Sequence, residues 1–145
     1  MNDKRPSIVK IIWVNYWAFL SAIFAIVGPS IYIYDRFFAP KPTENFFWIA
    51  IGIFFSALLG LLTRIVSILS ICNNGQNVKA TIFEIGFFRD RGHIKFLYTF
   101  QGQKYIVRQR VMKNKITLQF QHGQEVDILI NSENPKKAVI KDLFM

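Results

Sequence analysis

The sequence contains a single cysteine, Cys72, and only two histidines, His93 and His122. One thiol cannot build an internal disulfide framework, so the fold must be stabilised in another way. Neither histidine has a cysteine, a carboxylate or the other histidine at the spacing of a metal site. We therefore expect neither a metal nor another cofactor.

The sequence also lacks the short motifs that mark common catalytic sites. It has no G-x-S-x-G, C-x-x-C, H-E-x-x-H or P-loop pattern. Asp90 lies near His93, but the serines gather in the apolar half of the chain, away from this pair. The pattern predicts that the protein is not an enzyme and has no catalytic residues.

Charged side chains are missing from two long stretches, residues 11–34 and residues 45–63. A helix that crosses the hydrocarbon core of a bilayer needs about 20 apolar residues. The first stretch meets this length, and the second does so because its apolar character continues to Cys72. The polar segment between them, residues 35–44, is short. The pattern predicts a hairpin of two transmembrane helices, at about residues 11–34 and 46–72.

Aromatic residues at the start of the first stretch favour a membrane anchor that is not cleaved. A signal peptide is the alternative, but the apolar run is about twice the usual length of about 7–15 residues. Trp13 and Trp17 lie where aromatic belts occur at membrane interfaces.

Arg64 is expected to extend from the second helix to the headgroups on the same side. The alternative for Arg64 is a buried functional charge.

The distribution of positive charge predicts the topology of this hairpin. Lys4, Arg5 and Lys10 precede the first helix, whereas the loop contributes Arg36 and Lys41. Basic residues near helix ends stay cytoplasmic. Both termini are therefore predicted to be cytoplasmic, in the inner membrane of a bacterium. The C-terminal half agrees with this, because it has twelve basic and six acidic residues.

Small residues recur in both predicted helices. Gly52, Ser56 and Gly60 are four residues apart, and Ser21 and Gly28 belong to a similar run in the first helix. Small side chains let helices approach closely in a membrane. We interpret Gly52, Ser56 and Gly60 as the positions at which the two helices of the hairpin pack against each other. The alternatives are a homo-oligomer or docking on a larger membrane protein.

The sequence divides into a tail with the hairpin, residues 1–72, and a small β domain, residues 76–145. Asn73, Asn74 and Gly75 form a helix stop, since both residue types tolerate the left-handed conformation that ends helices. The connection is so short that the β domain must lie against the membrane surface.

Period-two alternation begins after this stop. Residues 93–100 place apolar side chains on one face and polar side chains on the other, and Gln101 and Gly102 form a tight turn before residues 103–112. We expect five or six antiparallel strands in a small barrel or rolled sheet. The remaining strands are expected at residues 78–88, 125–130 and 138–141.

The tight turn sets the register of the two strands beside it. If Phe100 faces Gln103, then Tyr98 faces Tyr105 on an apolar face of the sheet. A slip by one residue would mix charged and apolar side chains on that face. This argument favours a single register.

In this register the opposite face carries like charges side by side. Lys95 is opposite Arg108, and His93 is opposite Arg110. Such pairs destabilise a sheet by about 0.2–1 kcal/mol each, and a bound anion would relieve the cost. The nearest anions are acidic lipid headgroups, toward which each basic residue contributes about 1 kcal/mol. We hypothesise that these four residues bind anionic lipid or an acidic protein partner.

Two alternatives apply to the same four residues. The first is an ordinary solvated face of a basic protein. The second is nucleic acid, which is disfavoured because the aromatic residues that would stack on bases are expected in the core.

Several short segments of the β half stand out: V-K-A-T-I-F-E at 78–84, Y-T-F-Q-G-Q-K-Y at 98–105, Gly123, V-D-I-L-I at 126–130, and Asn134 with Pro135. Together they resemble an uncharacterised bacterial family, a domain of unknown function in small membrane-anchored proteins. The resemblance covers about residues 76–143. It implies a small β domain on a membrane anchor and no particular activity. Ile130 stands where the family usually has a tyrosine.

Together these features predict a non-enzymatic integral membrane protein. Its β domain would make protein or lipid contacts at the cytoplasmic surface, as an accessory to a larger assembly. The alternative is a membrane-tethered domain that senses a small ligand. A polar pocket inside the barrel would favour that alternative, and a fully packed core would disfavour it.

Overall fold

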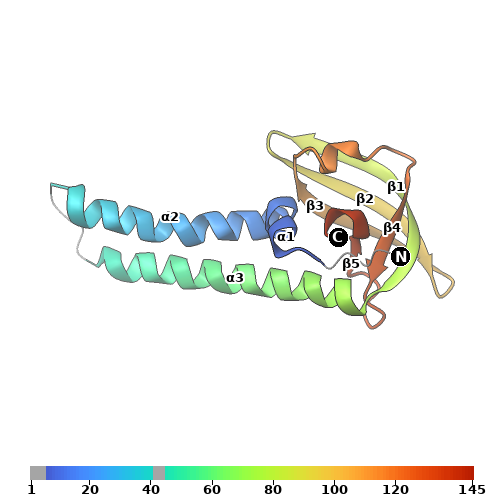
Figure 1. Cartoon of the computed structure of the whole chain (residues 1–145), viewed down its shortest axis with the longest axis horizontal. Helices are drawn as coiled ribbons and strands as arrows, with labels where there is room; N and C mark the ends of the chain where they lie inside the picture. The colour runs from blue at the N-terminus through green and yellow to red at the C-terminus, as the bar shows by residue number, and fades with distance from the viewer. Residues whose placement is uncertain (1–5, 41–44) are drawn as a thin grey trace.

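The structure is a computed structural model that describes residues 6–40 and 45–145. Two long helices run antiparallel to each other, and a curled sheet lies at one end of the pair (Figure 1). Three of the basic residues used to predict the topology, Lys4, Arg5 and Lys41, lie outside the described residues.

The two long helices are α2, Tyr16–Phe38, and α3, Phe46–Asn74. At 1.5 Å per residue they are about 35 and 43 Å long, and a bilayer core is about 30 Å thick. Both are long and apolar enough to cross a membrane. Only 11% and 6% of their most apolar windows is buried, whereas the core helix of a soluble domain is mostly buried. The prediction of two long apolar helices is confirmed.

The first predicted helix is wrong at its start. A separate short helix, α1 (Ile8–Val14), comes first, and the chain becomes extended at Asn15 with φ −82° and ψ 116°. The Asn15 side chain then accepts hydrogen bonds from the backbone N–H groups of Trp17 and Ala18, both at 3.1 Å. Asparagine is a favoured N-cap because it satisfies these free N–H groups. The long helix therefore begins at residue 16 instead of residue 11.

The interpretation of the small residues on α3 is wrong for two of the three. A Cβ added at Gly60 would lie 3.2 Å from Ser21 Oγ on α2, so Gly60 does face the partner helix. A Cβ at Gly52 would meet nothing within 4 Å, and Ser56 is exposed. Eight residues of a helix make two full turns and about 80° more. Small residues that recur every four positions therefore do not stay on the line along which the two helices touch. The other close approach lies at Gly28, whose added Cβ would lie 3.3 Å from the side chain of Ile53.

The β domain is a five-stranded antiparallel sheet in the order β3-β2-β1-β4-β5, curled into a nearly closed barrel. This confirms the prediction of a small antiparallel barrel or rolled sheet. A single turn of 3-10 helix, η1 (Thr117–Gln119), lies between β3 and β4, and a second, η2 (Lys141–Leu143), follows β5. The strands are β1 Gln76–Phe88, β2 Arg91–Phe100, β3 Gln103–Met112, β4 Glu125–Ile130 and β5 Ala138–Ile140.

The predicted register of β2 against β3 is confirmed. Tyr98 pairs with Tyr105, and their rings stack with centroids 5.6 Å apart. The turn between the strands has Gln101 at φ 49° and Gly102 at φ 78°. Two successive residues with positive φ match the right-handed twist of a two-residue hairpin, and glycine adopts this conformation without strain.

The barrel has a seam between its edge strands, β3 and β5. Gln109 on β3 is buried, and its Oε1 accepts a hydrogen bond of 3.1 Å from the backbone N–H of Ile140 on β5. Farther along β3, Val111 forms a bridge with Asn15 at the junction of α1 and α2. The side chain of Gln109 and the helix junction thus close the seam that the strands leave open.

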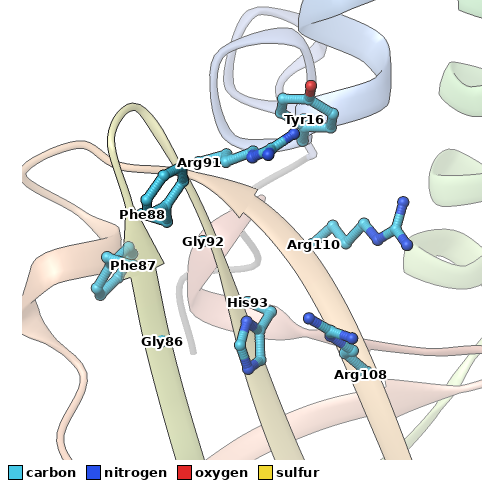
Figure 2. A pocket seen from close by; sticks show the side chains of 9 residues that line it. All are labelled: Tyr16, Gly86, Phe87, Phe88, Arg91, Gly92, His93, Arg108 and Arg110. Carbon is cyan, nitrogen blue, oxygen red and sulfur yellow. The ribbon is translucent and has the colours of Figure 1, made fainter.

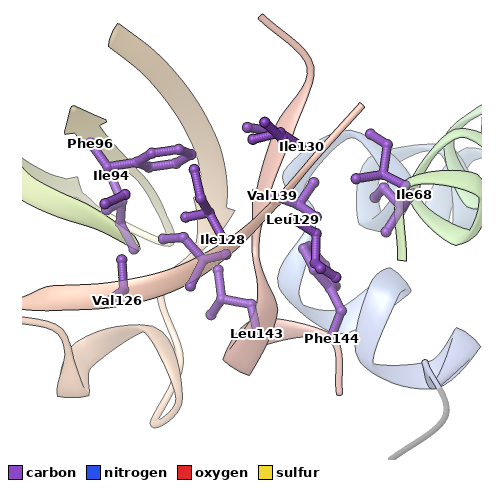
Figure 3. Close-up of a cluster of buried hydrophobic side chains, with 14 of the residues drawn as sticks. Ile68, Ile94, Phe96, Val126, Ile128, Leu129, Ile130, Val139, Leu143 and Phe144 are labelled. Atoms are coloured by element: carbon purple, nitrogen blue, oxygen red, sulfur yellow. The ribbon is translucent and has the colours of Figure 1, made fainter. Parts of the chain in front are cut away.

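One buried apolar cluster joins the helices to the barrel (Figure 3). Ile11 and Val14 of α1 are fully buried in it, and the last turns of α3 contribute the buried side chains of Ile68 and Ile71. The cluster crosses the predicted boundary between residues 1–72 and 76–145. Apolar side chains fill the barrel interior, including Ile82, Ile94, Phe96, Ile128, Ile130 and Phe144.

Candidate functional site

The outward face of β3 carries two exposed arginines next to the helical hairpin. Arg108 and Arg110 alternate with the inward-facing residues Val107, Gln109 and Val111, as the two-residue period of a strand requires. Figure 2 shows the Arg110 side chain extending toward α3. Because β3 is an edge strand, no further strand covers the side from which these arginines reach the helices.

Arg110 also links β3 to the first turn of α2. Its guanidinium carbon lies 5.3 Å from the centre of the Trp17 ring. Such a cation–π contact contributes about 0.5–1 kcal/mol at an exposed site. The contact fixes Arg110 beside the aromatic residue that the sequence predicted as an interface anchor.

Five basic side chains meet around a hollow of about 360 Å³ between the end of the hairpin and the barrel seam. They come from α3, from β3 and from the segment that precedes β5. Among the described residues that line this hollow, none is acidic. We call it the basic groove; its cations are Arg64, Arg108, Arg110, Lys136 and Lys137.

A second hollow, of about 460 Å³, lies on the other side of Arg108 and Arg110 (Figure 2). It is bounded by Tyr16 at the start of α2 and by the turn between β1 and β2, including Phe88 and Arg91. We call it the turn pocket. The two arginines of β3 line both hollows, so positive charge extends from the turn to the seam.

The four residues predicted to bind an anion do not act alike. Lys95 Nζ lies 2.6 Å from one carboxylate oxygen of Glu84, and His93 Nε2 lies 2.8 Å from the other. Hydrogen bonds from Lys95 and His93 lower the pKa of Glu84. Arg108 and Arg110 form no ion pair within residues 6–40 and 45–145. For Lys95 and His93, an anion that relieves the repulsion from the like charges on β3 is therefore supplied by the protein itself, in the carboxylate of Glu84.

Gly86 makes the Glu84 arrangement possible. It pairs with His93 across β1 and β2, and a Cβ at this glycine would lie 2.6 Å from the imidazole ring. A side chain there would push the ring off the strand. A bulge between Ile82 and Glu84 shifts the register just before this point and brings Glu84 opposite Lys95.

The three predicted interface anchors gather at one end of the hairpin. Ser21 lies beside Gly60, so Trp17 and Arg64, each one turn farther along, lie at one level and both line the basic groove. Trp13 belongs to α1, but its ring lies 5.6 Å from that of Phe19 on α2. From Arg64 back to the start of α3 the helix covers about 27 Å, close to the thickness of a bilayer core.

Metal chemistry has no evident location in the described part of the chain. No group of three or more His, Cys, Asp or Glu side chains lies within reach of one ion there. Protein-family models, curated proteins and solved structures contain no match to this chain. No relative supplies a function, and the basic groove has to be judged on its own chemistry.

Proposed function

We propose that the protein is a non-enzymatic integral membrane protein whose basic groove binds the phosphates of acidic lipids. The hairpin of α2 and α3 spans the bilayer, and the β domain lies on its cytoplasmic surface. The observation that carries this proposal is the convergence of five cations from three parts of the chain beside Trp17 and Arg64. These two residues lie where an apolar span of bilayer thickness ends.

The electrostatics of the groove support an anionic ligand. Like charges held together in one hollow repel one another, and the repulsion is relieved when an anion binds between them. Near an acidic bilayer, each basic residue contributes about 1 kcal/mol to attraction. Lys136 and Lys137 add two positive charges to those of Arg108 and Arg110, so the groove carries more positive charge than β3 alone.

We also propose that the protein lies in a bacterial cytoplasmic membrane with both termini inside. Basic segments next to transmembrane helices remain on the cytoplasmic side. The outward positions Gly52 and Ser56 leave a face of α3 free for a larger membrane protein, to which this protein would be an accessory. A ligand-sensing role is less well supported, because apolar side chains fill the barrel interior.

Lipid retention by the purified full chain tests the proposal. The protein is exchanged into a neutral detergent and titrated with phosphatidylglycerol or phosphatidylcholine, and bound lipid is counted by native mass spectrometry. We expect selective binding of phosphatidylglycerol. Removing two cations with Arg108→Gln and Arg110→Gln should weaken it by about 2 kcal/mol, or about 30-fold.

The matched control removes two charges elsewhere on the β domain. Lys104 and Lys115 are exposed and line neither hollow, so Lys104→Gln with Lys115→Gln should leave binding nearly unchanged. Equal binding of the two lipids by the wild-type protein would contradict the proposal. Equal losses of lipid binding in the two double variants would also contradict it, because they would show that only the net charge of the protein matters.

A further inference from the structure

The turn between β1 and β2 presents an aromatic ring between two arginines. Phe88 is 62% exposed, and the guanidinium carbons of Arg89 and Arg91 lie 5.4 and 5.9 Å from the centre of its ring. Asp90 completes the turn, which therefore has a net charge of +1. The exposed ring keeps apolar surface in contact with water, and a ring flanked by cations is suited to a boundary between apolar and charged surroundings.

The turn is held in one conformation. Arg89 has a φ of 53°, and the backbone N–H of Lys113 donates a hydrogen bond of 2.9 Å to the carbonyl oxygen of Asp90. A Cβ at Gly92 would lie only 2.3 Å from the Phe87 ring, so Phe87 closes over the strand. Phe88 is thus presented outward by a supported turn.

The turn also lies at the level of the membrane boundary. Phe88 and Arg91 line the turn pocket together with Tyr16, the residue next to Trp17. In Figure 1 the turn lies on the side of the barrel that faces the hairpin, beside the start of α2. The turn lies on one side of Arg108 and Arg110, and the basic groove lies on the other. Both therefore lie at the plane of the proposed membrane boundary.

We propose that Phe88 inserts into the headgroup region of the bilayer that the hairpin spans. Its ring lies at the acyl boundary, while Arg89 and Arg91 contact lipid phosphates. This inference rests on the proposed membrane insertion and adds a second, separate contact between the β domain and the lipid. The hairpin and the turn then hold the barrel to the bilayer at two separate points.

Fluorine NMR of the full chain in vesicles tests the inference while keeping an aromatic ring at the site. 4-Trifluoromethylphenylalanine is placed at position 88, in vesicles of mixed phosphatidylglycerol and phosphatidylcholine. A nitroxide on the lipid headgroup should broaden this signal several-fold more than a water-soluble gadolinium chelate does.

Two further positions serve as controls. Lys104 is exposed beside the turn that joins β2 to β3, at the end of the barrel away from the hairpin (Figure 1), and should respond only to the soluble chelate. Phe55 is 61% exposed in the middle of α3 and should respond to a nitroxide in the acyl chains. If position 55 responds and position 88 behaves like position 104, the inference about Phe88 is wrong. If position 55 does not respond, the proposed membrane insertion is wrong as well.

Discussion

Glu84 determines how much of the positive charge on β2 and β3 is available to an external anion. It neutralises Lys95 and draws His93 toward β1, away from the groove. Arg108 and Arg110 remain without a carboxylate partner in the described part of the chain and line both hollows. A single carboxylate thus pairs the two cations of β2, Lys95 and His93, and leaves the two arginines of β3 without a carboxylate partner in the described part of the chain.

We expect Glu84→Gln to lower the thermal unfolding midpoint of the full chain at pH 7. Hydrogen bonds from Lys95 and His93 lower the pKa of Glu84 from its ordinary 4.5. Its carboxylate therefore stabilises the fold above pH 4.5, and this contribution is lost as the pH falls through the lowered pKa. Circular dichroism in detergent should show the difference from wild type shrinking as the solution is acidified below about pH 4.

Glu125→Gln, at the exposed start of β4, serves as the control and should leave the midpoint unchanged. A midpoint difference for Glu84→Gln that stayed constant down to acidic pH would contradict the role of its charge.

The sequence was sufficient to predict that Glu84 pairs with Lys95, but it was not sufficient to predict the basic groove. The register arithmetic that paired Tyr98 with Tyr105 also applies to the first turn: if Phe88 faces Arg91, then Glu84 faces Lys95. The approach of Lys136 and Lys137 to β3 depends on how far the sheet curls. No local pattern in the sequence determines that curvature.

At the scale of elements, α1 and α2 show why an apolar run does not by itself indicate a membrane span. Residues 11–34 are uncharged throughout, but the first four belong to a helix whose Ile11 and Val14 lie in the β domain core. A protein core and a bilayer both select apolar side chains. The one local signal was Asn15, a favoured helix N-cap between two apolar segments.

The contact between α2 and α3 gives a prediction for two glycines of the same helix. Gly60→Leu should destabilise the protein by about 1–3 kcal/mol, because the new side chain would collide with Ser21 on α2. Gly52→Leu adds the same side chain where an added Cβ meets nothing within 4 Å, and should change stability little. Thermal unfolding of the two variants in the same detergent measures the difference.

Equal destabilisation by both substitutions would show that the loss of a small residue matters by itself. Oligomer disruption by Gly52→Leu alone, seen by light scattering, would instead show that the outward face is an interface.

At the scale of the whole molecule, the helices and the barrel share one apolar core. The backbone N–H of Ser7 donates a hydrogen bond of 3.1 Å to the carbonyl oxygen of Phe144, and Asn15 bridges to Val111. α1 and the end of α3 supply core that the strands lack. Residues 74–145 alone would therefore expose apolar surface and an open seam.

Two isoleucines of α1 test this coupling. Ile11 is fully buried, and Ile11→Ala should destabilise the β domain by about 2–5 kcal/mol. Ile8 is 51% exposed, and Ile8→Ala should have an effect within about 0.5 kcal/mol. Hydrogen exchange of the β3 and β5 amides in the full chain reports the difference. Unchanged exchange in Ile11→Ala would show that the barrel does not depend on α1.

The continuity of α3 has a mechanical consequence. The helix runs without a break from Phe46 to Asn74, its last turns are fixed in the core by Ile68 and Ile71, and β1 starts two residues later. Helices adjust to a thinner or thicker bilayer by tilting. With no hinge along α3, such a tilt in a bilayer would move the whole barrel together with the helix. The thickness of the bilayer would thereby set the angle at which the β domain meets its surface.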